Sequence, residues 1–173
     1  ILQGYLGNNP VTIYTNTRQV LQEISRQTRQ NPGRVYRIGT GELTDSLALD
    51  SLTDFNRELI RRFSGRKVIM EFKTKTDRVK HLPRVKAHNM VLSWSLNPPA
   101  VIRQEEFKSA SLEKRIAAAQ KGFRKGYRLG FHFDPILDIP SREKAYRRTI
   151  EKLQAKIPES GVFCISLGSL RFP

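Results

Sequence analysis

Short apolar segments of the β type alternate with amphipathic segments of the α type along most of this 173-residue chain. The spacing of apolar residues predicts helices over 17–30, 51–64, 77–81, 111–125 and 141–157. Alternation of this kind is typical of repeated βα units, so we predict an α/β fold with a parallel sheet, open or curled into part of a barrel. The six predicted strands are Val11–Thr15, Val35–Ile38, Lys67–Phe72, Met90–Leu96, Tyr127–Phe133 and Val162–Ser166.

The length suits a single domain over residues 1–173. A hydrophobic fraction of 38% argues against disorder, and no apolar run approaches the roughly 20 residues that span a membrane. The lone Cys164 excludes an intramolecular disulfide and a cysteine-built metal cluster from this chain alone, so we expect a reducing, cytoplasmic setting. Because Ile1 is not a start methionine, we interpret the chain as a fragment.

The strongly basic balance points to a polyanionic partner. Thirty-one Lys and Arg against sixteen Asp and Glu give a formal net charge of +15 and a pI near 10.4. Nucleic acid is the first partner that such a charge indicates. A basic surface kept only for solubility is the alternative, because the charge is spread along the chain.

The chemistry is expected first in the segment that follows the second predicted strand. Gly39 and Gly41 allow tight backbone conformations or close approach to a ligand, and Glu42 and Thr44 follow directly. In α/β proteins ligands bind at the carboxyl ends of strands. The segment is neither a P-loop nor a G-x-G-x-x-G motif, so a purely structural loop is the competing interpretation.

Later strands also end in polar residues, and these ends share one edge of a parallel sheet. Carboxylate, ammonium, hydroxyl and amide groups together suit a zwitterionic ligand that carries hydroxyls. Lys73 and Lys75 are expected to alternate, with Lys73 pointing away. Each residue also has an ordinary structural interpretation, and the three histidines lack metal-ligand spacing. The residues expected at this edge are Glu42, Thr44, Lys73, Lys75, Ser93, Ser95, Asn97, His132, Asp134, Ser169 and Arg171.

A series of motifs resembles the spore photoproduct lyase family of radical S-adenosylmethionine proteins. The motifs come in the family's order and cover nearly the whole chain: Ile-Leu-Gln-Gly-Tyr-Leu at the start, Gly39-Thr-Gly-Glu-Leu-Thr-Asp-Ser-Leu47, Lys73-Thr-Lys75, Ser93-Trp-Ser-Leu-Asn-Pro98, Gly130-Phe-His-Phe-Asp-Pro135 and Ser166-Leu-Gly-Ser-Leu-Arg171. The resemblance implies a partial parallel β/α barrel of about six strands.

The resemblance also implies the cofactors, which are S-adenosylmethionine and a [4Fe–4S] cluster on a C-x3-C-x2-C loop. The three cluster cysteines would lie just before Ile1, so no metal ligand is expected in this chain, and the fragment by itself is expected to be inactive. The family's cofactor motif falls on Gly39, Gly41 and Glu42, which would receive the amino group. Its remaining cofactor positions, for the methionyl and ribose parts, fall on Thr44, Lys75 and Ser95.

One departure from the family concerns the hydrogen donor, a cysteine that aligns with Glu42. The leading hypothesis is a radical S-adenosylmethionine enzyme repairing thymine photoproducts in DNA, with no catalytic residue assigned. Because the donor cysteine is missing, a different nucleic-acid substrate and a non-catalytic nucleic-acid-binding relative stay open. A metal-independent βα-barrel enzyme acting on a phosphorylated metabolite is a third hypothesis.

Overall fold

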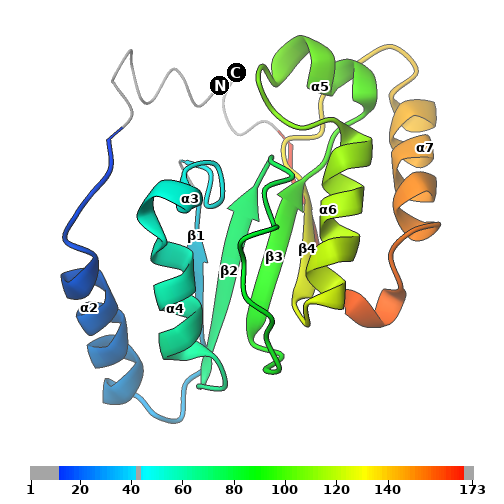
Figure 1. The fold of residues 1–173 in the computed structure, drawn as a ribbon. Coiled ribbons are helices and arrows are strands. Elements are labelled where there is room, and N and C mark those ends of the chain that lie inside the picture. Colours follow the sequence, from blue (N-terminus) through cyan, green and yellow to red (C-terminus); the bar gives the residue numbers. More distant parts are fainter. Residues whose placement is uncertain (1–11, 42–43, 170–173) are drawn as a thin grey trace.

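Five parallel strands form one sheet in the order in which they occur along the chain (Figure 1). The computed structural model describes residues 12–41 and 44–169, so the predictions for Glu42 and Arg171 lie outside the described residues. Each strand pairs in parallel with the next, which confirms the α/β prediction. The strands are β1 (Tyr36–Thr40), β2 (Val68–Thr74), β3 (Met90–Ser95), β4 (Arg128–Phe133) and β5 (Val162–Leu167).

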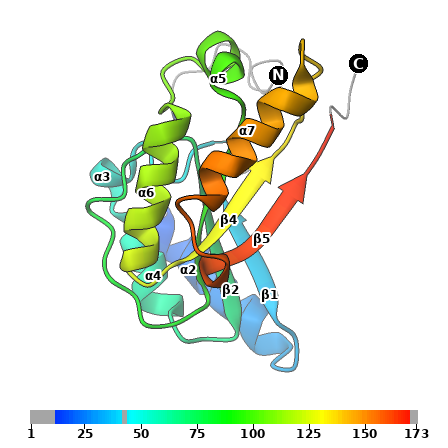
Figure 2. The ribbon, with the colours of Figure 1, turned by 90° about the vertical axis from the view of Figure 1, so that its right-hand side faces the viewer.

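One helix, α2, precedes β1 and the others connect successive strands; α4, α6 and α7 pack on the same face of the sheet (Figures 1 and 2). Ser111 begins α6 by accepting a hydrogen bond from the backbone N–H of Lys114, which satisfies one of the unpaired donors of the first turn. No described helix combines the length and the apolar character that a membrane crossing requires. The helices are α2 (Thr17–Gln30), α3 (Asp50–Thr53), α4 (Phe55–Phe63), α5 (Pro99–Glu105), α6 (Leu112–Arg124), α7 (Arg142–Gln154) and the 3-10 turn η1 (Glu159–Gly161).

Three sequence predictions of secondary structure are wrong. Residues 12–15 are exposed coil and not a first strand, and residues 77–81 form no helix. The helix predicted over 51–64 is two helices, because Asp54 between α3 and α4 takes a left-handed conformation with φ of 52°. In addition, residues 99–105 form α5, where the sequence predicts no helix, and Pro99 begins it at a position where proline is tolerated.

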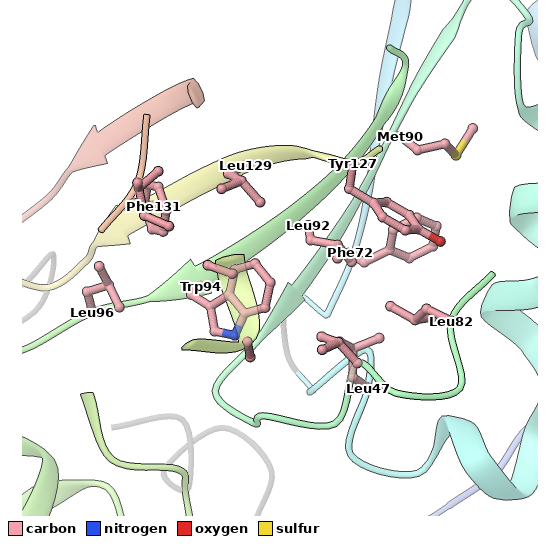
Figure 3. Close-up of a cluster of buried hydrophobic side chains, with 14 of the residues drawn as sticks. Leu47, Phe72, Leu82, Met90, Leu92, Trp94, Leu96, Tyr127, Leu129 and Phe131 are labelled. Atoms are coloured by element: carbon pink, nitrogen blue, oxygen red, sulfur yellow. The ribbon is translucent and has the colours of Figure 1, made fainter. Parts of the chain in front are cut away.

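The apolar core lies between the sheet and these helices (Figure 3). Phe72, Leu92, Trp94 and Phe131 point to this side from three neighbouring strands, and none exposes any of its surface. Trp94 is therefore a core residue, and its indole N–H donates to the carbonyl of Thr76. With the alternate residues of β2 and β3 committed to this core, their neighbours in the sequence must face the opposite side of the sheet.

The opposite side of the sheet, which we call the inner face, is curled. Arg37 on the first strand lies close to Cys164 on the last, with Nη2 and Sγ 3.3 Å apart. An irregularity in the β4–β5 register lies beside Phe163, whose ring is flanked by the guanidinium groups of Arg37 and Arg128 at 5.4 and 5.2 Å from its centre. These contacts across the sheet give it the curvature of an incomplete barrel.

Candidate functional site

The loop after β1 folds back against the end of β2 and begins the candidate site. Gly41 has φ of 82°, and a Cβ atom there would lie 2.6 Å from Ser46 Oγ and 2.7 Å from the carbonyl oxygen of Lys73. Only glycine fits this conformation and this close approach. The backbone N–H of Ser46 then donates to the Lys73 carbonyl at 2.9 Å, which joins the loop to the neighbouring strand.

Asp45 fixes the same loop through both oxygens of its carboxylate. Oδ1 accepts hydrogen bonds from the backbone N–H groups of Leu47 and Ala48 and from Thr74 Oγ1, and Oδ2 accepts one from the backbone N–H of Lys75 at 2.7 Å. The adjacent Thr44 is exposed. Asp45 therefore places the loop that carries Thr44 beside the strand end that carries Lys75.

Lys75 and Ser95 lie at the carboxyl ends of neighbouring strands, and a buried ion pair stands behind them. Arg115 is fully buried and donates to the Ser95 carbonyl at 2.7 Å and to Glu106 Oε2 at 2.5 Å. The other Glu106 oxygen lies 3.5 Å from Lys75 Nζ and accepts a hydrogen bond from Asn97. We call this edge, with Gly41, Thr44, Lys75 and Ser95, the rim.

The Glu106 carboxylate is ionised in this setting. Burial by itself would raise the pKa of its carboxyl group, but the charge of Arg115, the hydrogen bond from Asn97 and the charge of Lys75 outweigh burial and lower that pKa. Lys75 thus has a fixed negative partner on one side, while its side chain remains 44% exposed on the other. An ammonium group held in this way can still meet a ligand carboxylate.

A second polar network occupies the inner face below the rim, and each of the five strands contributes one residue to it: Arg37, Glu71, Ser93, His132 and Ser166. Glu71 is its centre, because its carboxylate is 2% exposed and accepts hydrogen bonds from Ser93 Oγ at 2.6 Å and Arg37 Nε at 2.9 Å. His132 Nε2 lies 2.8 Å from the same carboxylate, and His132 Nδ1 lies 2.5 Å from Ser166 Oγ.

The electrostatics of this network define the state of its two central residues. Burial alone would raise the pKa of the Glu71 carboxyl, but hydrogen bonds from His132, Ser93 and Arg37 outweigh it and hold the pKa at about 2. An ionised carboxylate can only accept hydrogen bonds, so His132 Nε2 must carry a proton. Gly130 leaves the room for this arrangement, because a Cβ atom there would lie 2.2 Å from Ser93 Oγ.

Other residues predicted for the strand ends are placed differently. Lys73 does not alternate away from the inner face: its Cε lies 3.9 Å from the position of a Cβ on Gly39, and residues two apart in a strand share a face. Asn97 is buried, and its amide donates a hydrogen bond to Glu106 and accepts one from the hydroxyl of Tyr146. The amide is therefore used in contacts within the protein. Asp134 and Ser169 are exposed beyond β4 and β5.

Comparison with known proteins identifies the family. The family model described as "Spore photoproduct lyase" matches residues 1–169. The chain belongs to the spore photoproduct lyase family. The spore photoproduct lyase of Bacillus subtilis (strain 168) is 30% identical over 161 residues, covering 91% of this chain and 47% of the relative. The enzyme of Geobacillus sp. (strain Y412MC61) is 26% identical over 162 residues, covering 90% and 47%. The chain thus spans about half the length of these relatives.

Solved structures of spore photoproduct lyase share the fold. A mutant of that enzyme with bound AdoMet and dinucleoside spore photoproduct superposes with a TM-score of 0.91 at 25% identity, over 99% of this chain and 52% of that one. Another, complexed with dinucleoside spore photoproduct, gives 0.85 at 25% identity, over 91% of this chain and 47% of that one. The partial-barrel fold implied by the motifs is confirmed, with five strands in the described part of the chain.

Sequence reasoning missed Glu71 and Arg115, the two residues that organise the inner face and the rim. Glu71 interrupts the apolar run Val68-Ile-Met-Glu-Phe72, and a charged residue in the middle of a buried strand was a signal that could have been used. Arg115 gave no such signal, since a basic residue in an amphipathic helix ordinarily lies on its solvent side. Cys164 is partly exposed on the inner face beside Arg37.

Proposed function

We propose that these residues form the cofactor-binding barrel of a radical S-adenosylmethionine enzyme that acts on DNA, with lesion repair of the spore photoproduct type as its reaction. The observation that carries the proposal is the match over almost the whole chain to a spore photoproduct lyase with bound AdoMet and dinucleoside spore photoproduct. The family membership and the net charge of +15 support it.

The rim suits S-adenosylmethionine in the kinds of groups it presents. Lys75 offers an ammonium group for the carboxylate of the ligand, and Ser95 and Thr44 offer hydroxyls for its methionyl and ribose parts. Glu42, which lies outside the described residues, would receive the amino group. Gly39 and Gly41 fall on the family's cofactor motif, and Gly41 lets the loop pack closely against Ser46 and the Lys73 carbonyl at the start of the rim.

The chain's own contribution to the reaction is to bind and orient. When bound, the cofactor supplies a carbon-centred radical. Asp45 holds the loop of Thr44 against the backbone of Lys75, and Glu106 with Arg115 holds the Lys75 ammonium and the Ser95 strand end. Contacts of this kind restrict the side chains of the rim, so that little side-chain freedom is left to lose on binding. Below them, Glu71 fixes the proton of His132 on Nε2.

An iron–sulfur cluster needs ligands that the described residues do not provide. No group of three or more His, Cys, Asp or Glu in residues 12–41 and 44–169 is placed to hold a metal ion. The proposal therefore places the cluster cysteines outside residues 1–173, in a protein that is longer than this chain and works in a reducing, cytoplasmic compartment.

The full-length protein, reconstituted anaerobically with iron and sulfide, tests the proposal. It should develop the visible absorbance of a [4Fe–4S] cluster and, on reduction, cleave S-adenosylmethionine. Failure of both would contradict it. The missing donor cysteine favours one alternative, a non-catalytic relative that only binds nucleic acid. In that case DNA binding would be salt-dependent and unaffected by Glu42→Gln, and no cofactor would be cleaved.

A further inference from the structure

The amino ends of the strands lie at the opposite end of the sheet from the rim (Figure 1), and six exposed basic residues lie close to them in the sequence. Two arginines lie in the last turns of α2 and α4, and the other four basic residues lie in the connections that lead into β1, β2 and β3. All six are exposed. The residues are Arg29, Arg34, Arg62, Arg66, Lys67 and Lys86, which we call the amino-end face.

None of these six forms an ion pair with a carboxylate of residues 12–41 or 44–169. Neutral groups hold four of them instead. Arg62 Nε donates to Ser25 Oγ at 2.9 Å, and Arg66 Nε donates to the Arg62 carbonyl at 2.9 Å. Lys67 Nζ donates to a backbone carbonyl, and the Arg34 guanidinium lies 5.0 Å from the centre of the Tyr36 ring. The cations are therefore oriented but not neutralised.

Helix electrostatics account for only part of this face. A basic residue in a last helical turn is stabilised by the negative end of the helix dipole, and this explains Arg29 and Arg62. Arg34, Arg66 and Lys86 belong to no helix, so the dipole gives no reason for them. Their accumulation without acidic partners raises the local positive potential, which favours a bound polyanion.

The face also has a hollow in which an anion can sit. A cavity of about 370 Å³ lies between α2 and α4, and its walls include the side chains of Arg26, Arg29 and Arg62. Arg26 is already paired with Glu23, while Arg29 and Arg62 direct unpaired positive charge to the cavity. Arginine is better suited than lysine to phosphate, because its planar group can donate two parallel hydrogen bonds.

We propose that the amino-end face binds phosphates of the nucleic-acid backbone, at a site separate from the rim. The choice of nucleic acid rests on the proposed function. The strands between the amino-end face and the rim are five to seven residues long. At a rise of about 3.3 Å per residue, they separate the two places by roughly 17–23 Å. That distance is about five to seven nucleotides at 3.4 Å per nucleotide, so a polymer can reach both places and a small anion cannot.

Duplex binding by the full-length protein tests the proposal, with the dissociation constant of a 30-base-pair DNA measured across a series of salt concentrations. The test variant combines Arg29→Gln, Arg62→Gln and Arg66→Gln. The matched control, Arg103→Gln, Lys144→Gln and Arg148→Gln, removes the same charge from exposed positions of α5 and α7 that also form no ion pair with a described carboxylate. The test variant should bind roughly tenfold more weakly at low salt, and its slope of log K against log salt should shrink by about 0.9 for each phosphate that the variant no longer neutralises. The control should keep the wild-type slope.

Equal losses of DNA affinity in the test and control variants would overturn the proposal, because net charge alone would then explain them. Failure of the wild type to bind DNA would also overturn it. Vesicles of phosphatidylglycerol and phosphatidylcholine test an anionic membrane as the alternative partner. If the test variant loses vesicle binding but keeps its DNA binding, the proposal is also overturned. S-adenosylhomocysteine binding is measured in parallel. If S-adenosylhomocysteine binds neither the wild type nor the variants, while the salt slopes of DNA binding differ between the test and control variants as stated, the assignment of the rim as the cofactor site fails and the proposal for the amino-end face stands.

Discussion

The two ends of the sheet carry charge in opposite ways. At the carboxyl end, Arg115 and Glu106 are almost fully buried and pair with each other, and Glu106 also meets Lys75. At the amino end, residues such as Arg66 and Lys86 are exposed and have no acidic partner in the described part of the chain. Buried pairs fix geometry at a high desolvation cost, whereas exposed unpaired charges contribute little to folding and remain available to a partner. The comparison predicts that mutations at the two ends have different effects.

The largest effect on stability is expected from Arg115→Ala. The change leaves the Glu106 carboxylate buried without its main cation and removes the hydrogen bond to the Ser95 carbonyl. Breaking a buried pair from one side should lower the free energy of unfolding by about 3–5 kcal/mol. Urea denaturation measures it, with Arg103→Ala, an exposed arginine of α5, as the control that should change by less than about 0.5 kcal/mol. Equal effects of the two substitutions would contradict the assigned role of the buried pair.

The network on the inner face should make the free energy of unfolding depend on pH in the acid range. The pKa of Glu71 is about 2 in the folded protein and near 4.5 when unfolded, so its contribution is present above pH 4.5 and is lost as pH falls toward 2. A difference of this size corresponds to about 3 kcal/mol. The free energy of unfolding of the wild type should therefore fall toward that of Glu71→Gln between pH 4.5 and pH 2. Parallel curves for the two proteins over this range would show that Glu71 is not held ionised.

At the rim, Lys75→Ala should weaken S-adenosylmethionine binding in the full-length protein by roughly tenfold to a hundredfold, since a charge-assisted hydrogen bond contributes about 1.5–3 kcal/mol. Isothermal titration of the reconstituted protein measures the affinity. Lys73→Ala is not a suitable control, because Lys73 lies on the inner face beside Gly39. Lys144→Ala on α7 is exposed and should leave the affinity unchanged. An unchanged affinity for Lys75→Ala would remove Lys75 from the proposed site.

The strands and the placement of the rim could be predicted because both depend on local pattern and on parallel topology. Apolar runs defined β2 to β5, and parallel connection alone brings Lys75 and Ser95 to one edge. The left-handed conformation of Asp54 could not be predicted, since aspartate is compatible with a continuous helix and tertiary contacts decide its conformation. The same limit explains why the helix predicted over 51–64 is two helices.

The residues that organise the site were less accessible to prediction than those that line it. Glu71 is joined to Arg37 and His132 by contacts that span 34 and 61 positions, which no local pattern encodes. The Arg115 hydrogen bond to Ser95 spans 20 positions and depends on how α6 packs. Motif resemblance names the positions proposed to bind a ligand, but the residues that support them become visible only when the strands are assembled.

The smallest effect on folding, and the sharpest contrast between the two ends, is expected from Lys86→Gln. Lys86 is exposed in the connection into β3 and has no ion pair in the described part of the chain, so its loss should change the free energy of unfolding by no more than about 0.5 kcal/mol. If Lys86 contacts a DNA phosphate, one fewer counterion is released on binding, and the magnitude of the salt slope should fall by about 0.9. Urea denaturation and duplex titration on the same preparation separate the two quantities. A loss of stability with no change of slope would place Lys86 among the structural charges and narrow the amino-end face to the arginines around α2 and α4.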